Sequence, residues 1–410
     1  ETLGAIDIIC SDKTGTITQN KMTVKDEYVI DEKMLNYICA LCNDGLIYKD
    51  KYVGDPTETC LYAYLYNKKI NSLNLRKKCE RLLDVPFDSD RKMFTTLNKI
   101  DDNVYVLCKG SMDSLIEKVN LSKTQKEEVL DKVKNFSKNA LRTLGFAYKK
   151  LDYVPKNIKE LEKEENNLSF AGILGMIDPP RKSVKESVAL CKNAGIRPIM
   201  ITGDGIDTAT TIAKDVGIIT SDNEAILGSE LDKYNDKELE DIVKKYSVYA
   251  RVNPTHKEKI VFALQSSGKI VAMTGDGVND APAIKDAHVG VGMGITGTDV
   301  TKSASDIVLM DDSFSTIVVA IEEGRRIYNN IRNNIVFSLS SNFAEIFTII
   351  IGLFTKTTIL LPIYILFIDL VTDSIPSICL SFEKSEDGIM NKKPRGINKP
   401  LLKLVSHFQL

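Results

Sequence analysis

The chain has 410 residues, of which 43% are hydrophobic, and its formal net charge is −2. This length predicts more than one domain, and the nearly balanced charge argues against a general nucleic-acid-binding protein. The eight cysteines follow no disulfide or zinc-binding spacing, so we expect free thiols in a reducing, cytosolic compartment.

The first stretch with a clear pattern is an apolar run at 6–10, which predicts a buried strand that ends at Asp12 in a polar loop. A carboxylate at the carboxyl end of a parallel strand lies where open α/β sheets bind ligands, so Asp12 is a candidate nucleophile toward phosphorus. The alternative is an aspartate that only caps a turn. The chain opens at Glu1, one strand before Asp12 and without an initiator methionine, so we expect a piece of a larger protein.

The following part of the chain predicts a smaller α+β domain. Helical spacing occurs in two pieces within 31–66, strand patterning at 85–97 and 104–108, and an amphipathic helix at 123–140. The Lys- and Glu-rich stretch at 156–167 predicts a solvated loop.

Two strands of this domain carry residue types that suit a nucleotide. Phe87 and Lys92 belong to one strand region, and Lys109 and Gly110 follow the next. An aromatic ring stacks on a purine, a lysine attracts phosphate, and a glycine lets the backbone approach closely. The alternative interpretation is a core phenylalanine with two surface lysines.

After a strand at 170–177 and the stiff sequence Asp178-Pro-Pro-Arg181, strands and helices alternate up to about residue 310. This rhythm predicts a parallel, doubly wound sheet that also contains the strand at 6–10. The loops at the carboxyl ends of its strands hold Asp12, Thr202, Asp276 and Asp280.

These loops predict a phosphoryl-transfer site. Asp12, Asp276 and Asp280 are acidic enough to hold Mg²⁺, with the carbonyl of Thr14 as an extra ligand. The groups expected to neutralise or hydrogen-bond the phosphoryl group are Lys257, Thr202, Gly203 and Asn279. The alternative for each loop is a turn stabilised by Asp and Gly.

Two apolar runs, 335–354 and 359–380, are long enough to span a bilayer, and basic residues flank their outer ends. Both outer ends are therefore expected to face the cytosol. The polar residues inside the runs are Asn342, Glu345, Asp369, Thr372 and Asp373. Three carboxylates without an internal cation favour a bound metal ion, and oxygen ligands suit Ca²⁺. Pro362 and Pro376 are expected to loosen the second helix; hydrogen bonds between the helices are the alternative role for Asn342 or Thr372.

The motifs occur in the order found in the haloacid-dehalogenase superfamily, and DKTGTIT with TGDGVNDAPAIKDAHVGVGMG resembles the P-type ATPases. The resemblance implies a haloacid-dehalogenase-like doubly wound phosphorylation domain with an inserted α+β nucleotide-binding domain and a C-terminal transmembrane hairpin. The implied ranges are 1–30 and 173–323 for the phosphorylation domain, 31–172 for the nucleotide-binding domain, 324–382 for the stalk and two transmembrane helices, and 383–410 for a cytosolic tail.

Shorter motifs extend the resemblance to the P2 subfamily. Gly54-Asp-Pro-Thr-Glu58 is similar to a motif whose glutamate lies near the adenine, and Arg142 matches an arginine that reaches the nucleotide phosphates. The implied nucleotide-binding residues are Glu58, Phe87, Lys92, Lys109, Gly110, Arg142, Thr14, Asp204 and Arg251. Ser89 stands where calcium pumps usually have arginine. Ser-Ser-Asn-Phe-Ala-Glu at 340–345 resembles calcium pumps, whereas Asp369 resembles sodium/potassium pumps.

The resemblance thus implies an ATP-driven, Mg²⁺-dependent cation transporter with an aspartyl-phosphate intermediate, a multi-pass membrane protein with cytoplasmic catalytic domains. Calcium is the expected cation, and a sodium/potassium-type pump is the first alternative. Thr14 stands where phosphatases of the superfamily carry a second aspartate, so the intermediate should be long-lived. The actuator domain and the other transmembrane helices are missing from this sequence, which leaves a membrane-tethered phosphatase and a non-enzymatic fragment as further alternatives.

Overall fold

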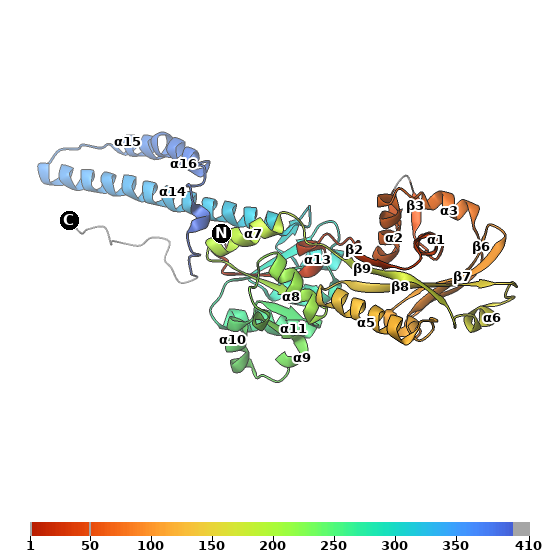
Figure 1. Cartoon of the computed structure of the whole chain (residues 1–410). Coiled ribbons are helices and arrows are strands. Elements are labelled where there is room, and N and C mark those ends of the chain that lie inside the picture. Colours follow the sequence, from red (N-terminus) through yellow and green to blue (C-terminus); the bar gives the residue numbers. More distant parts are fainter. Residues whose placement is uncertain (1, 49–50, 397–410) are drawn as a thin grey trace. The chain divides into compact units, whose positions relative to one another are not determined.

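The chain divides into two compact units, seen in a computed structural model that describes residues 2–48 and 51–396 (Figure 1). Unit 1 contains Glu1–Ile17, Lys182–Gly203 and Ala213–Leu410, and unit 2 contains Thr18–Arg181 and Asp204–Ile212. Half of the tail expected at 383–410, residues 397–410, lies outside the described residues.

Unit 1 is built on a seven-stranded sheet in which every strand pair is parallel. The strand order is β11 (Ala225–Leu227), β12 (Val248–Ala250), β10 (Arg197–Ile201), β1 (Ile8–Asp12), β13 (Val271–Gly275), β14 (Val289–Met293) and β15 (Ile307–Leu309). The prediction of a parallel sheet that includes the strand before Asp12 is confirmed. The short strands β11 and β12 were not predicted, since three residues are too few for a periodic pattern.

Helices pack on this sheet through an apolar core. Ile8, Cys10 and Met273 of the strands lie in one buried cluster with Ile260 and Leu264 of α11 (Pro254–Ser266). The other helices between 182 and 304 are α7 (Val184–Asn193), α8 (Ile206–Asp215), α9 (Gly228–Leu231), α10 (Asp236–Lys245), α12 (Ala281–Asp286) and α13 (Asp299–Ala304). The buried apolar residues hold the strands in place and leave their polar carboxyl ends free for chemistry.

Unit 2 is built on a six-stranded antiparallel sheet. Its order is β2 (Thr23–Val29), β9 (Ser169–Ile177), β8 (Arg142–Leu151), β7 (Asn103–Gly110), β6 (Met93–Ile100) and β5 (Glu80–Asp88), with a separate hairpin of β3 (Leu46–Tyr48) and β4 (Lys51–Val53). Because β2 and β9 belong to this sheet, the unit extends beyond both ends of the range 31–172 given above for the nucleotide-binding domain.

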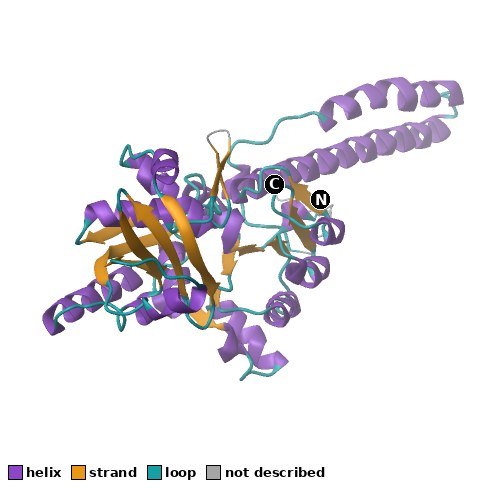
Figure 2. Cartoon of the chain, turned by 90° about the vertical axis from the view of Figure 1, so that its right-hand side faces the viewer, coloured by secondary structure: helices purple, strands orange, loops and turns teal. Residues whose placement is uncertain are grey.

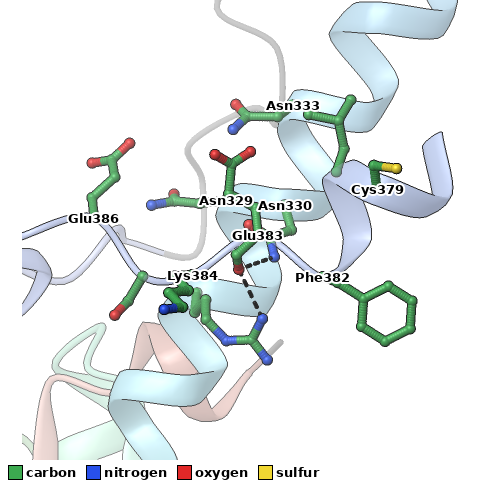
Figure 3. A pocket seen from close by; sticks show the side chains of 11 residues that line it. Asn329, Asn330, Asn333, Cys379, Phe382, Glu383, Lys384 and Glu386 are labelled. Atoms are coloured by element: carbon green, nitrogen blue, oxygen red, sulfur yellow. Dashed lines mark hydrogen bonds between the residues drawn. The ribbon is translucent and has the colours of Figure 1, made fainter. Parts of the chain in front are cut away.

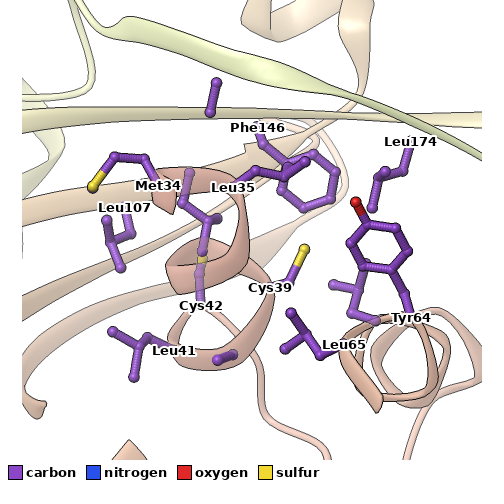
Figure 4. Packing of buried hydrophobic residues seen from close by; sticks show 14 of the residues in the cluster. Met34, Leu35, Cys39, Leu41, Cys42, Tyr64, Leu65, Leu107, Phe146 and Leu174 are labelled. Atoms are coloured by element: carbon purple, nitrogen blue, oxygen red, sulfur yellow. The ribbon is translucent and has the colours of Figure 1, made fainter. Parts of the chain in front are cut away.

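Helices cover both faces of the sheet of unit 2. They are α1 (Glu32–Leu41), α2 (Pro56–Asn67), α3 (Ser72–Lys78), α4 (Met112–Leu115), α5 (Lys123–Lys138) and α6 (Ile158–Lys163). Phe146 packs with Leu35 and Cys39 of α1 (Figure 4), whereas its neighbour Ala147 packs in a second cluster with Phe136 of α5. Successive residues of a strand point to opposite faces, so the two clusters are two cores on either side of one sheet.

The stretch at 156–167 was predicted to be a solvated loop, and this prediction is wrong. Residues 158–163 form α6, Leu161 is fully buried, and Glu165 is 1% exposed. The high content of Lys and Glu in this stretch indicates solvent exposure, although Leu161 and the carboxylate of Glu165 are buried.

The C-terminal part of unit 1 contains two helical segments that are long and apolar enough to cross a membrane. The first is α14 (Phe314–Thr355), and the second comprises α15 (Pro362–Phe367), the π-helical turn η5 (Ile368–Asp373) and α16 (Ser374–Ser381). Figure 2 shows the two segments lying side by side. Pro362 starts α15 and does not loosen it, which corrects the expectation above; Pro376 lies in the first turn of α16, which follows the π-helical turn.

The buried position of Phe146 leads to a test of the core of unit 2. Phe146→Ala should lower the free energy of unfolding by about 3–5 kcal/mol, because a fully buried ring is replaced by a cavity. Tyr66→Ala, at a side chain that is 72% exposed, should cost little. Urea unfolding of both variants measures the difference, and equal losses would contradict the packing.

Candidate active site

Asp12 ends the central strand β1 at the carboxyl edge of the sheet. Its backbone N–H donates to Oγ1 of Thr274 at 3.3 Å, and the N–H of Thr14 donates to its Oδ1 at 3.4 Å. The chain turns away through Gly15, whose φ of 76° is a conformation that glycine adopts without strain. These contacts fix the Asp12 carboxylate at the position where parallel sheets bind ligands.

Lys257 lies in the first turn of α11 and reaches this carboxylate. The helix starts with Pro254, and Asn253 caps it by accepting from the N–H of His256 at 2.8 Å. The Lys257 Nζ donates to Asp12 Oδ2 and to Asp280 Oδ1, each at 2.6 Å. Burial alone would lower the pKa of Lys257, but the two carboxylates outweigh burial and raise it. Lys257 is therefore a buried cation that stays charged at neutral pH.

Three carboxylates meet around this lysine. Asp12, Asp276 and Asp280 each place a carboxylate oxygen within 4.8 Å of the others. Asp280 Oδ2 accepts from the N–H groups of Asp276 and Gly277, at 3.3 and 3.1 Å. Gly275 makes this close approach possible, since a Cβ there would lie 2.5 Å from the Asp280 Cβ. Burial, followed by the charges of Asp12 and Asp280, raises the pKa of Asp276. A clustered set of hard oxygen donors fits Mg²⁺.

Sequence reasoning missed the threonines that hold this loop. Thr301 Oγ1 donates to the carbonyl oxygens of Asp276 and Gly277 at 3.2 and 3.0 Å, and the Thr298 N–H donates to the Asp276 carbonyl at 3.0 Å. Thr274, which accepts from Asp12, was missed as well. No local pattern marks these residues, because each acts on a partner in another loop.

The other predicted residues of the phosphoryl site are distributed as follows. Thr202 is buried and directly follows Ile201, the register partner of Asp12, so it lies at the same edge of the sheet. Gly203 has open space at its Cβ position. Asn279 and Arg251 are exposed, and Arg251 has a φ of 50°. Asp204 is grouped with unit 2.

In unit 2, the residues predicted to bind a nucleotide are of two kinds. Lys109 is 4% exposed and donates to Glu58 Oε1 at 2.5 Å, so it is a buried partner of Glu58 and not a free surface charge. Gly110 packs tightly, because a Cβ there would lie 2.7 Å from the Lys92 carbonyl oxygen. The side chains of Phe87, Lys92 and Arg142 are exposed.

The two apolar helical segments bring three acidic residues together. Asp369 and Asp373 lie in η5, and their charges act on Glu345 of α14. The Oε1 atom of Glu345 is buried without a hydrogen-bond partner in the part of the chain that the structure describes. Asn342 and Thr372 are exposed. A buried carboxylate oxygen without a hydrogen-bond partner is suited to bind a cation.

A pocket of about 710 Å³ lies where the segment after α16 crosses α14 (Figure 3). Arg326 and Asn330 of α14 both donate to the carbonyl oxygen of Glu383, at 3.0 and 2.9 Å. These contacts tie the outer end of the second segment to the first.

The acidic cluster leads to a test of metal binding. With Mg²⁺ tenfold above its dissociation constant, the chain should gain about 1.4 kcal/mol of stability, and Asp276→Asn should lose this gain. Asp286→Asn, at the exposed end of α12, should retain it. Thermal melting with and without Mg²⁺ measures the gain, and a gain that persists in Asp276→Asn would exclude Asp276 as a ligand.

Comparison with known proteins finds similar domains and similar full-length proteins. Residues 32–183 match the family P-type ATPase, cytoplasmic domain N, and residues 357–408 match Cation transporting ATPase, C-terminus. The chain is 44% identical to Calcium-transporting ATPase 1 of Bacillus cereus, over 98% of the chain and 48% of that protein. It is 42% identical to Calcium-transporting ATPase 1 of Lactococcus lactis, over 97% and 48%.

A relative whose name gives a different cation is Potassium-transporting ATPase alpha chain 2 of Homo sapiens, which is 36% identical over 98% of the chain and 46% of that protein. The chain spans about half the length of the curated relatives it matches. By its domains and its relatives, the chain belongs to the P-type ATPases.

Proposed function

We propose that this chain is the catalytic part and one membrane hairpin of a P2-type cation pump that is phosphorylated by ATP on Asp12. Unit 1 then carries a haloacid-dehalogenase-like phosphorylation domain, and unit 2 is the nucleotide-binding domain. The observation that carries the proposal is the buried contact of Lys257 with Asp12 and Asp280, beside Asp276.

In the proposed reaction, a carboxylate oxygen of Asp12 attacks the γ-phosphorus of ATP. A bond from this oxygen to phosphorus forms, the bond to the bridging oxygen breaks, and ADP leaves with the electron pair. Lys257 neutralises negative charge at the attacking carboxylate, while Thr202, Gly203 and Asn279 offer hydrogen bonds to the phosphoryl oxygens. Asp12, Asp276, Asp280 and the Thr14 carbonyl would hold Mg²⁺, which supplies positive charge to the phosphoryl oxygens when bound.

The same site would keep the acyl phosphate intact after transfer. The side chain at position 14 is a hydroxyl and not a carboxylate, so this loop offers no general base to activate water. Hydrolysis then depends on a group brought from elsewhere in the full-length protein.

Nucleotide binding is proposed for unit 2. The exposed ring of Phe87 offers a stacking surface for the base, and the exposed cations Lys92 and Arg142 offer charge to the phosphates. Lys109 supports this site through its ion pair with Glu58, and Gly110 does so through its close packing on Lys92. Asp204, also grouped with unit 2, and Arg251, which belongs to unit 1, are proposed as further nucleotide contacts.

The proposed transported cation is Ca²⁺. Glu345, Asp369 and Asp373 supply hard carboxylate oxygens, and Asn342 and Thr372 supply neutral ones. The names of the bacterial relatives support calcium, while the human potassium-transporting relative supports the alternative of a potassium-type pump. The length and composition of the two helical segments support a multi-pass membrane protein with its catalytic units in the cytoplasm.

The helix α14 offers a direct mechanical link between the two sites. Near its N-terminus, Gly324 packs against Gly4, so closely that a Cβ on Gly324 would lie 2.8 Å from the Gly4 nitrogen. Gly4 precedes β1 and Asp12, whereas the other end of α14 carries Asn342 and Glu345. A shift of β1 on phosphorylation would therefore move one end of the helix that holds the cation ligands.

Phosphorylation on Asp12 has a direct chemical test. The full-length protein should incorporate label from γ-labelled ATP in a form that is stable to acid and removed by hydroxylamine, as an acyl phosphate is. Asp12→Asn should reduce this label to background, because an amide cannot form the anhydride, while Asp286→Asn should retain it. Label that persists in Asp12→Asn would place the acceptor elsewhere.

The membrane site has a separate test. In the full-length protein, Glu345→Gln should reduce the apparent affinity for Ca²⁺ in activating phosphorylation by about tenfold or more, since a ligand charge is lost. Ser340→Ala is the matched control, because its hydroxyl donates within its own helix to Val336. A tethered phosphatase would instead hydrolyse phosphomonoesters at the same rate in both variants.

A further inference from the structure

Glu165 is a buried carboxylate in unit 2 to which no part of the proposed reaction assigns a role. Its side chain is 1% exposed and accepts from the Arg91 guanidinium, from Thr95 Oγ1 at 2.6 Å, and from Lys118 Nζ at 3.0 Å. The ionised form of a buried carboxylate requires partners of this kind. Thr95 lies in strand β6 and Lys118 follows the end of α4, so these two contacts hold Glu165 near both elements.

The Arg91 guanidinium connects Glu165 to the end of strand β5. Its Nη1 faces Glu165, while its Nη2 donates to the carbonyl oxygens of Pro86 at 2.6 Å and Val85 at 3.3 Å. The backbone N–H of Arg91 donates to Asp88 Oδ1 at 2.9 Å. The Arg91 side chain therefore holds the backbone just before position 87, and the Arg91 backbone N–H holds the Asp88 side chain just after it.

Phe87 lies between these anchored residues and is 63% exposed. An exposed ring at the end of a strand has little packing of its own to fix it. The Arg91 guanidinium fixes the backbone at Val85 and Pro86, directly before the ring, and the charge of Glu165 orients this guanidinium.

We propose that Glu165 and Arg91 are positioning residues that hold Phe87 ready to stack on the purine of ATP. The inference rests on the proposed function of unit 2 as a nucleotide-binding domain. The guanidinium is suited to this role because its donors lie in a rigid planar fork, so one nitrogen faces the carboxylate while the other reaches the backbone carbonyls. A ring that is ordered before binding loses less entropy when the base arrives.

The test is a double-mutant cycle on ATP affinity in the full-length protein, measured by calorimetry. Phe87→Ala should weaken ATP binding about tenfold or more through lost stacking. Arg91→Lys and Glu165→Gln should each weaken it several-fold in the wild-type background and less than about twofold in the Phe87→Ala background. Arg91→Lys keeps a cation beside Glu165, so it remains informative if Glu165→Gln unfolds.

Glu164→Gln is the matched control. This neighbouring carboxylate pairs with Lys149 and Tyr153, each at 2.7 Å, and not with the segment around Phe87. It should leave ATP affinity unchanged, and thermal melting of all variants shows which remain folded.

The possible outcomes distinguish a failure of the positioning role from a failure of the proposed nucleotide site. If Phe87→Ala weakens ATP binding but Arg91→Lys does not, or if their effects add in full, the positioning role is overturned and the nucleotide site stands. If Phe87→Ala leaves ATP affinity unchanged, the proposed nucleotide site is wrong, and the positioning role falls with it.

Discussion

The catalytic unit depends on one buried cation placed between carboxylates. Without the charge of Lys257, Asp12, Asp276 and Asp280 would repel one another at distances below 5 Å in a site that excludes much of the water. The charge of Lys257 offsets this repulsion, and its contact with Oδ2 orients the Asp12 carboxylate at the edge of the sheet. Charged groups gathered in this way are typical of functional sites, which favours the proposed binding of a metal ion together with a phosphoryl group.

The parallel sheet explains how such distant residues meet. Asp12 and Lys257 are 245 positions apart in the sequence, yet β1 lies in the centre of the sheet and its carboxyl end faces the first turn of α11. The same strand is preceded by the turn that packs on α14, so the edge of the sheet that holds Asp12 and the two apolar helical segments are connected by packing within unit 1. Phosphorylation and cation binding would be coupled through this packing, because closely packed protein interiors are hard to compress and transmit strain.

Much of the fold and of the candidate site was predictable because it leaves a local pattern in the sequence. Apolar runs that end in Asp12 and Asp276 mark strand ends, and the two apolar segments mark the hairpin. Contacts that depend on tertiary packing left no such trace. Thr301 acts on a loop 25 residues away, and Glu165 meets Thr95 and Arg91 across 70 and 74 residues, inside a stretch whose composition indicates solvent exposure. The burial of Lys109 against Glu58 was hidden for the same reason.

The central claim is that the carboxylate of Asp12 itself accepts the phosphoryl group. Borohydride reduces an aspartyl phosphate to homoserine, so the full-length protein can be incubated with ATP, reduced, digested and sequenced by mass spectrometry. The account predicts homoserine at position 12 and its loss when ATP is omitted. ATP hydrolysis with unmodified aspartate at position 12, or a stable phosphate on Ser11 or Thr14, would contradict it.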